Sequence, residues 1–304
     1  MITIPIKDRK GNIVGVIQAL NKRNGVFADN DMYLLTVLAN ILAIRIENAR
    51  MAEAETASFI KTIRMITKFL EARDAYTEKH SENVEKYMVA ICKIRGLSEE
   101  VIREFKLGAQ LHDIGKIGIP DAVLLKESGL TGDEYMIIKT HPKIGHDLLS
   151  HLDKLMTSLD VTLYHHERWD GKGYPSGLKG DGIPLSARIG AIADTFDAMT
   201  SDRPYRKGLR PSIAFSEVIK NAGAQFDPYL CRDIFAEYMK LHEDNKNGPY
   251  RVLMKLSKSL PESTDIDFEK KMKTFVNKFI LYTKSTDEKL LEDTVVARLF
   301  GITP

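Results

Sequence analysis

The chain has 304 residues, of which 43% are hydrophobic and 28% are charged, as expected of a globular protein with one large domain or two smaller ones. Its net charge of +2 argues against a nucleic acid polymer as partner, because proteins that bind one usually carry a concentrated basic face. The two cysteines lack CxxC spacing, which argues against a disulfide framework and fits a reducing cytoplasm.

The N-terminal part predicts a β-hairpin followed by a long helix. Residues 2–6 and 13–20 are rich in β-branched residues and flank a turn at 8–12, and Pro5 favours an edge strand. From Asp31 to Arg73 the chain has no Pro or Gly, and apolar residues recur every three or four positions. This pattern indicates one helix of about forty residues or two joined end to end, and two separate amphipathic helices on one core are the alternative.

The same region bears on membrane association. Its most apolar run, Leu34 to Ile44, is interrupted by Thr36 and Asn40 and is shorter than the roughly 20 residues that cross a bilayer. The N-terminus also lacks the charged and then apolar form of a signal peptide. We therefore expect a cytoplasmic protein without a membrane partner.

The remainder of the chain is expected to be mainly helical. Residues 77–245 show helical patterns separated by short loops, with a glycine-rich exception at 168–184. Residues 246–304 begin with a polar break and continue as charged amphipathic helices, including Asp267 to Thr283, without a chemical motif. The predicted fold class is mainly α, with a short N-terminal hairpin and a long linking helix.

Histidines and aspartates form the main chemical signal. An adjacent histidine pair precedes the glycine-rich loop, and Asp194 lies between apolar residues that would bury it. A buried carboxylate without a partner is costly, so a metal ion or another cation is expected beside it. Imidazole and carboxylate together are ligands for Zn, Fe or Mn. Three further histidines, His146, His151 and His242, are expected to be solvated or to have packing roles.

Four segments carry a resemblance to a known family. They are "HDIGKIGIPDAVLLK", "THPKIGHDLL", "HHERWDGKGYPSGLKGDGIPLSARI" and "ADTFDAMTSDRPYR". They resemble the HD-GYP family of metal-dependent cyclic di-GMP phosphodiesterases, within the HD phosphohydrolase superfamily, and the resemblance covers roughly residues 70 to 235. It implies an all-helical bundle with metals in its middle.

The resemblance also implies residue roles. The metal ligands would be His80, His112, Asp113, His141, His165, His166 and Asp194, with Asp113 bridging two ions. Lys116 would contact a phosphate or protonate the leaving oxygen, so Asp113 and Lys116 are the expected catalytic residues. Substrate-binding residues would be Lys116, Tyr174, Arg203 and Arg206, and Asp197 would support the site beside them.

Two divalent ions, Fe or Mn, suit this chemistry because together they can hold a hydroxide and the attacked phosphate. Some members of the family carry a Glu four residues before the first histidine and are thought to hold a third metal. Tyr76 occupies that position here, which favours two metals. We therefore expect linear pGpG as the main early product and GMP as a slower one.

Residues 1–48 resemble the last third of a GAF sensory domain. The expected organisation is this segment, a linker and dimerisation helix at 31–73, a catalytic domain at 74–245 and a helical extension at 246–304. The long apolar stripe predicts a parallel homodimer through that helix. An HD-type hydrolase of another nucleotide or phosphoester, and a non-catalytic cyclic di-GMP receptor, stay open as alternatives.

Overall fold

The computed structural model describes residues 1–73, 79–151, 159–202, 206–241, 270–271, 273–279 and 293–301. These residues form two compact units, residues 1–65 and residues 66–304. The division falls inside helix α1 (Asp29–Arg73), which is continuous over 45 residues. The expected long helix is therefore a single helix and not two separate ones.

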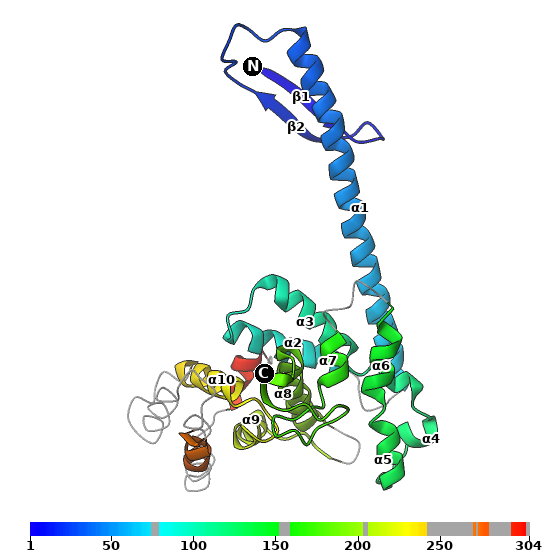
Figure 1. Ribbon diagram of the computed structural model, residues 1–304, viewed down its shortest axis with the longest axis vertical. Coiled ribbons are helices and arrows are strands. Elements are labelled where there is room, and N and C mark those ends of the chain that lie inside the picture. Colours follow the sequence, from blue (N-terminus) through cyan, green and yellow to red (C-terminus); the bar gives the residue numbers. More distant parts are fainter. Residues whose placement is uncertain are drawn as a thin grey trace. The chain divides into compact units, whose positions relative to one another are not determined.

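The first unit is a β-hairpin packed on α1 (Figure 1). Strand β1 (Ile2–Lys7) runs antiparallel to β2 (Ile13–Ala19), and the Asp8 carboxylate closes the turn by accepting a hydrogen bond from the backbone nitrogen of Asn12. Buried side chains of Ile4 and Ile6 pack against α1 at small residues. The predicted hairpin is confirmed, and its alternating pattern explains why one face meets the helix.

Helix α1 is more apolar than its most apolar run suggests. An 18-residue window of it has a mean hydropathy of 1.3, and only 11% of that window is buried. By length and composition this window could cross a membrane, contrary to the expectation drawn from Leu34 to Ile44 alone. Length and composition do not separate a membrane span from a helix face that packs against another chain.

All the named elements of the second unit in the described residues are helices. Its N-terminal half comprises α2 (His80–Ile94), α3 (Glu99–Leu111), η1 (Ile114–Gly118), α4 (Asp121–Leu124), α5 (Gly132–Ile138), α6 (His141–Leu149) and α7 (Leu159–Tyr164). The remainder comprises η3 (Gly180–Gly182), α8 (Leu185–Thr200), α9 (Pro211–Lys220), α10 (Pro228–Leu241) and α13 (Asp293–Phe300).

The core of this unit lies around α8, whose side chains are buried on nearly all sides. Phe196 of α8 stacks on Phe300 of α13 with ring centroids 4.3 Å apart, and Tyr87 of α2 meets Phe196 edge to face at 5.1 Å. Because Phe300 is fully buried, α13 belongs to the core although it comes from the region predicted as an extension. The surrounding helices place their ends near Asp194, where the polar residues gather.

Candidate metal centre

Seven side chains that the sequence nominated as metal ligands come together, six of them from the ends of several helices and Asp194 from the middle of α8. They are His80, His112, Asp113, His141, His165, His166 and Asp194. Two groups, His141 with His165 and His166, and His80 with His112 and Asp194, each place three donor atoms within 4.8 Å of one another. A third group of this kind, His112, Asp113 and His165, shares one residue with each of them and places Asp113 between them.

Backbone hydrogen bonds orient three of these imidazoles. The Nδ1 atoms of His112, His141 and His165 lie 2.7, 2.8 and 2.9 Å from carbonyl oxygens three or four residues earlier in the chain. A carbonyl oxygen can only accept, so Nδ1 carries the proton, and the lone pair belongs to Nε2. This arrangement is common among histidines that bind metals, because it fixes the tautomer and the ring orientation.

The Nε2 atoms of these histidines face one another in pairs. His80 Nε2 lies 3.2 Å from His112 Nε2, and His141 Nε2 lies 3.4 Å from His165 Nε2. Two lone pairs at such a distance repel unless a proton or a cation lies between them or beside them. The donor set, its burial and this geometry therefore fit a divalent metal.

Asp113 faces both histidine groups with different oxygens. Its Oδ1 lies 3.3 Å from His141 Nε2, whereas Oδ2 lies 3.4 Å from His112 Nε2 and 2.7 Å from Lys116 Nζ. Burial raises the pKa of Asp113, but Lys116 and the neighbouring histidines outweigh it and hold the pKa well below its usual range. The carboxylate is thus ionised and offers one oxygen to each group.

Gly115 allows this close arrangement. It lies in η1, and a Cβ on it would come 2.5 Å from the backbone nitrogen of Gly145 and would also collide with the His141 carbonyl group. Only glycine lets η1 and α6 approach so closely. As a result His141, the first residue of α6, reaches Asp113.

Asp197 supports His80 from behind. It is 1% exposed, and its Oδ2 lies 2.7 Å from His80 Nδ1, while Oδ1 accepts from Asn83 at 2.9 Å and Ser201 at 3.0 Å. Both carboxylate oxygens are therefore engaged by protein groups. Asp197 thus orients His80, one of the nominated metal-binding residues, and has no oxygen left for substrate. Burial lowers the pKa of His80, but Asp194 and Asp197 outweigh it and raise this pKa to about 10.

The adjacent histidines both enter the cluster because they follow the last turn of α7. The His165 nitrogen still donates to the carbonyl of Val161, and the two rings lie with centroids 4.0 Å apart. Burial lowers the pKa of His166 to about 4 and that of His165 well below its usual value. Both imidazoles are thus neutral near pH 7, the form that binds metals.

The glycine-rich loop returns over this pair. Tyr174 stacks on His166 with ring centroids 4.7 Å apart, and its nitrogen donates to the His166 carbonyl at 3.2 Å. A Cβ on Gly173 would lie 2.5 Å from Cα of Glu167, so only glycine fits there. Burial raises the pKa of Tyr174, so its hydroxyl stays protonated and can donate a hydrogen bond.

Two residues that sequence reasoning missed act beside the loop. Glu167 is 2% exposed, and its carboxylate accepts from the nitrogens of Ser176 at 2.6 Å and Leu178 at 3.0 Å, which pins the loop after Tyr174. Lys139 places its Nζ 5.0 Å from the ring centroid of Tyr174, within cation–π range. In the sequence, only closeness to nominated ligands could have pointed to these two residues. Lys139 lies two residues before His141, and Glu167 directly follows the pair His165 and His166.

Other nominated residues lie elsewhere. Arg206 is exposed, and its guanidinium donates to the carbonyl of Ala198 at 2.6 Å, whereas Arg203 lies outside the described residues, as do Tyr76 and His242. His146 and His151 belong to no ligand group among the described residues.

Comparison with known proteins places this site in context. The sequence profile of the HD domain family matches residues 64–230. The chain is 42% identical over 170 residues to the cyclic di-GMP phosphodiesterase response regulator RpfG of Xanthomonas campestris pv. campestris, covering 55% of this chain and 45% of that protein. It is 40% identical over 186 residues to a cyclic di-GMP phosphodiesterase of Thermotoga maritima, covering 60% of this chain and 50% of that one.

A third relative has a related substrate in its name. The chain is 31% identical over 202 residues to the 3'3'-cGAMP-specific phosphodiesterase 2 of Vibrio cholerae, covering 66% of this chain and 39% of that protein. The chain thus spans half or less of the length of these three curated relatives.

Proposed function

The chain belongs to the HD domain family, and we propose that it is a metal-dependent phosphodiesterase that hydrolyses cyclic di-GMP. The observation that carries this proposal is the position of Asp113, which presents one oxygen to each of two histidine groups. A non-catalytic receptor would not need a buried, ionised carboxylate between two groups of imidazoles.

We propose two divalent ions, Fe or Mn. Asp113 with His141, His165 and His166 would hold one ion, and the remaining group would hold the other, sharing the Asp113 carboxylate. His/Asp donor sets of this kind suit both metals. When bound, such ions would polarise the phosphate and lower the pKa of a water molecule.

The protein's own residues would orient the substrate and manage a proton. In hydrolysis a water oxygen bonds to phosphorus, and the bond from phosphorus to the ribose oxygen breaks. Lys116 Nζ lies 2.7 Å from Asp113, at the rim of the ligand cluster, where it could give a proton to that leaving oxygen. Tyr174 and Lys139 offer an aromatic face and a positive charge, which suit a base and a phosphate.

The proposed product, phosphate contacts and second substrate each rest on a separate observation. In the sequence, Tyr76 occupies the position at which some family members carry a Glu and are thought to hold a third metal, so we propose linear pGpG as the first product and GMP as a slower one. Arg206 and Arg203 would hold phosphates, which requires Arg206 to leave its contact with Ala198. The relative named for 3'3'-cGAMP makes that dinucleotide the second candidate substrate.

We also propose a homodimer through α1. Val37, Leu38 and Ile41 are 40%, 44% and 51% exposed on this helix, and a second copy of it would cover them. Light scattering that gives a monomer would contradict this homodimer.

The GAF-like nature of residues 1–48 and a cytoplasmic location remain predictions. A hairpin packed on a helix is compatible with a GAF-like segment.

A panel of substrates tests the function. Metal-loaded protein should hydrolyse cyclic di-GMP faster than 3'3'-cGAMP and a linear diester such as bis(p-nitrophenyl) phosphate. Faster turnover of 3'3'-cGAMP would replace the proposed substrate, and hydrolysis of the linear diester alone would favour another phosphoester.

A further inference from the structure

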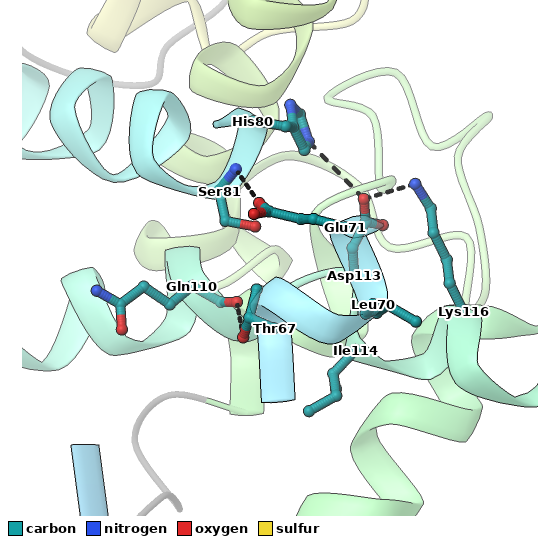
Figure 2. A pocket seen from close by; sticks show the side chains of 9 residues that line it. All are labelled: Thr67, Leu70, Glu71, His80, Ser81, Gln110, Asp113, Ile114 and Lys116. Carbon is teal, nitrogen blue, oxygen red and sulfur yellow. Dashed lines mark hydrogen bonds and ion pairs between the residues drawn. The ribbon is translucent and has the colours of Figure 1, made fainter. Parts of the chain in front are cut away.

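The last two turns of α1 contact three helix ends that carry site residues, and Figure 2 shows two of these contacts, Glu71 with Ser81 and Thr67 with Gln110. Helix α2 begins at His80, α3 ends one residue before His112, and η1 carries Lys116. The ends of helices leave backbone N–H and C=O groups without partners inside the helix. Side chains of α1 satisfy one or more of these groups at each of the three ends.

Glu71 caps the start of α2. Its Oε1 accepts a hydrogen bond from the nitrogen of Ser81 at 3.0 Å, directly after His80. The residue that precedes the helix, Lys79, has a positive φ of 68° and no side-chain hydrogen bond to the helix. A carboxylate at a helix N-terminus satisfies a free N–H and interacts favourably with the helix dipole. Glu71 therefore fixes the position from which His80 projects.

Arg73 clamps the end of η1. Its guanidinium donates to the carbonyl oxygens of Lys116 at 3.3 Å and Ile119 at 2.8 Å. It also donates twice to Asp121 Oδ1, at 2.9 and 2.6 Å, which holds the guanidinium plane in place. The planar group has five donors in a fixed fork, so these bonds set the orientation of the turn. The backbone of Lys116 is thereby held while its ammonium reaches Asp113.

Thr67 completes the set at the end of α3. Its hydroxyl donates to the carbonyl oxygen of Gln110 at 3.2 Å, two residues before His112, and both residues are 8% exposed. The space between this part of α1 and the site is small, with a cavity of about 10 Å³ that could hold about one water molecule. The helix end and the site are thus closely packed.

We propose that Thr67, Glu71 and Arg73 are positioning residues, so that the placement of the α1 end sets the metal affinity of His80 and the reactivity of Lys116. All three side chains lie on one helix within two turns, so a displacement of that helix end displaces all three caps together. The effect on turnover rests on the proposed phosphodiesterase function, whereas the effect on metal affinity does not.

The test uses the full chain with Mn²⁺ as the only probe in its first part. Glu71→Ala should weaken Mn²⁺ binding about tenfold, as outer contacts of metal ligands commonly do. Glu71→Gln keeps an oxygen that accepts the Ser81 bond, so it should weaken binding less than about threefold. Arg64→Ala removes an exposed arginine of the same helix and serves as the matched control, with unchanged binding.

The second part separates kcat from KM with cyclic di-GMP. Arg73→Ala should lower kcat about 10- to 100-fold and change KM less than about threefold, because a misplaced Lys116 affects the reaction more than binding. Circular dichroism checks folding. If Arg73→Ala does not fold, Arg73→Lys, which keeps the charge and loses the fork, carries the same test.

Some results would overturn the proposal. They are unchanged Mn²⁺ affinity in Glu71→Ala, equal losses in Glu71→Ala and Glu71→Gln, or wild-type kcat in folded Arg73 variants. Wild-type protein that binds Mn²⁺ without hydrolysing cyclic di-GMP would refute the proposed function, and the Glu71 titrations would still decide this inference.

Discussion

Replacing Glu167 by Gln should loosen the loop that carries Tyr174. The carboxylate is 2% exposed and accepts two backbone hydrogen bonds, from Ser176 at 2.6 Å and Leu178 at 3.0 Å. In Glu167→Gln the amide oxygen still accepts one of these bonds. The amide NH₂ then faces the other N–H, and two donors cannot bond to each other.

The size of the effect follows from these two contacts. A hydrogen bond to a charged group contributes about 1.5–3 kcal/mol, so loss of one should lower the free energy of unfolding by about that amount. Tyr174 lies two residues before Ser176 and stacks on His166. Loss of that stacking, worth about 0.5–1.5 kcal/mol, should raise KM roughly two- to tenfold.

The assay has an internal probe, because Trp169 is the only tryptophan and lies two residues after Glu167. Urea unfolding followed by its fluorescence gives the free energy of unfolding, and steady-state kinetics gives KM. Glu127→Gln, the same change at an exposed position, is the control. A free energy of unfolding within about 0.5 kcal/mol of the wild-type value would refute the capping role.

Five further predictions concern the metal centre and its rim. Asp113→Asn should lower metal affinity more than about tenfold and abolish turnover, and a variant with full metal content and activity would exclude the bridge. Lys116→Ala should retain its metal and lose about 10²- to 10⁴-fold in kcat, and a change in KM alone would contradict its proton role. In the folded, metal-free protein the pKa of His80 is about 10, so this imidazole is protonated near neutral pH. Metal binding should therefore release a proton. The metal affinity should rise about tenfold for each pH unit up to about pH 10. Calorimetry in buffers of different ionisation enthalpy measures this release, and none near pH 7 would contradict it. In metal-free protein the stability that His80 contributes should be fully present below about pH 6.5 and lost as pH rises through about 10, as pH-dependent unfolding would show. Lys139→Ala should raise KM more than it lowers kcat, and an unchanged KM would remove it from the substrate site.

The sequence predicted those parts of the fold that local patterns determine. Alternating apolar residues predicted the hairpin, and the absence of Pro and Gly predicted the continuous α1. The ligand residues were nominated by motif resemblance, and the structure brings all seven together. Spacing alone could not do this, because His80 and Asp194 lie far apart in the chain and meet only through the packing of α2 on α8.

Residues that act through tertiary contacts escaped prediction. Glu71 and Arg73 look like ordinary charged positions on an amphipathic helix, and only the folded chain brings them to the backbone of Ser81 and Lys116. No sequence pattern marks Glu167, because the backbone nitrogen of Ser176 reaches its carboxylate only when the glycine-rich loop folds back. Asp197 was expected to support the site, and only the folded chain shows that it does so by holding His80 from behind.

The most direct test of the central claim is a time course of cyclic di-GMP hydrolysis by Mn²⁺- or Fe²⁺-loaded protein, with products separated by chromatography and Asp113→Asn run in parallel. The account predicts that the wild-type protein forms linear pGpG first and GMP later, whereas the variant forms neither. Metal-loaded, folded wild-type protein that turns over no more cyclic di-GMP than Asp113→Asn would contradict it.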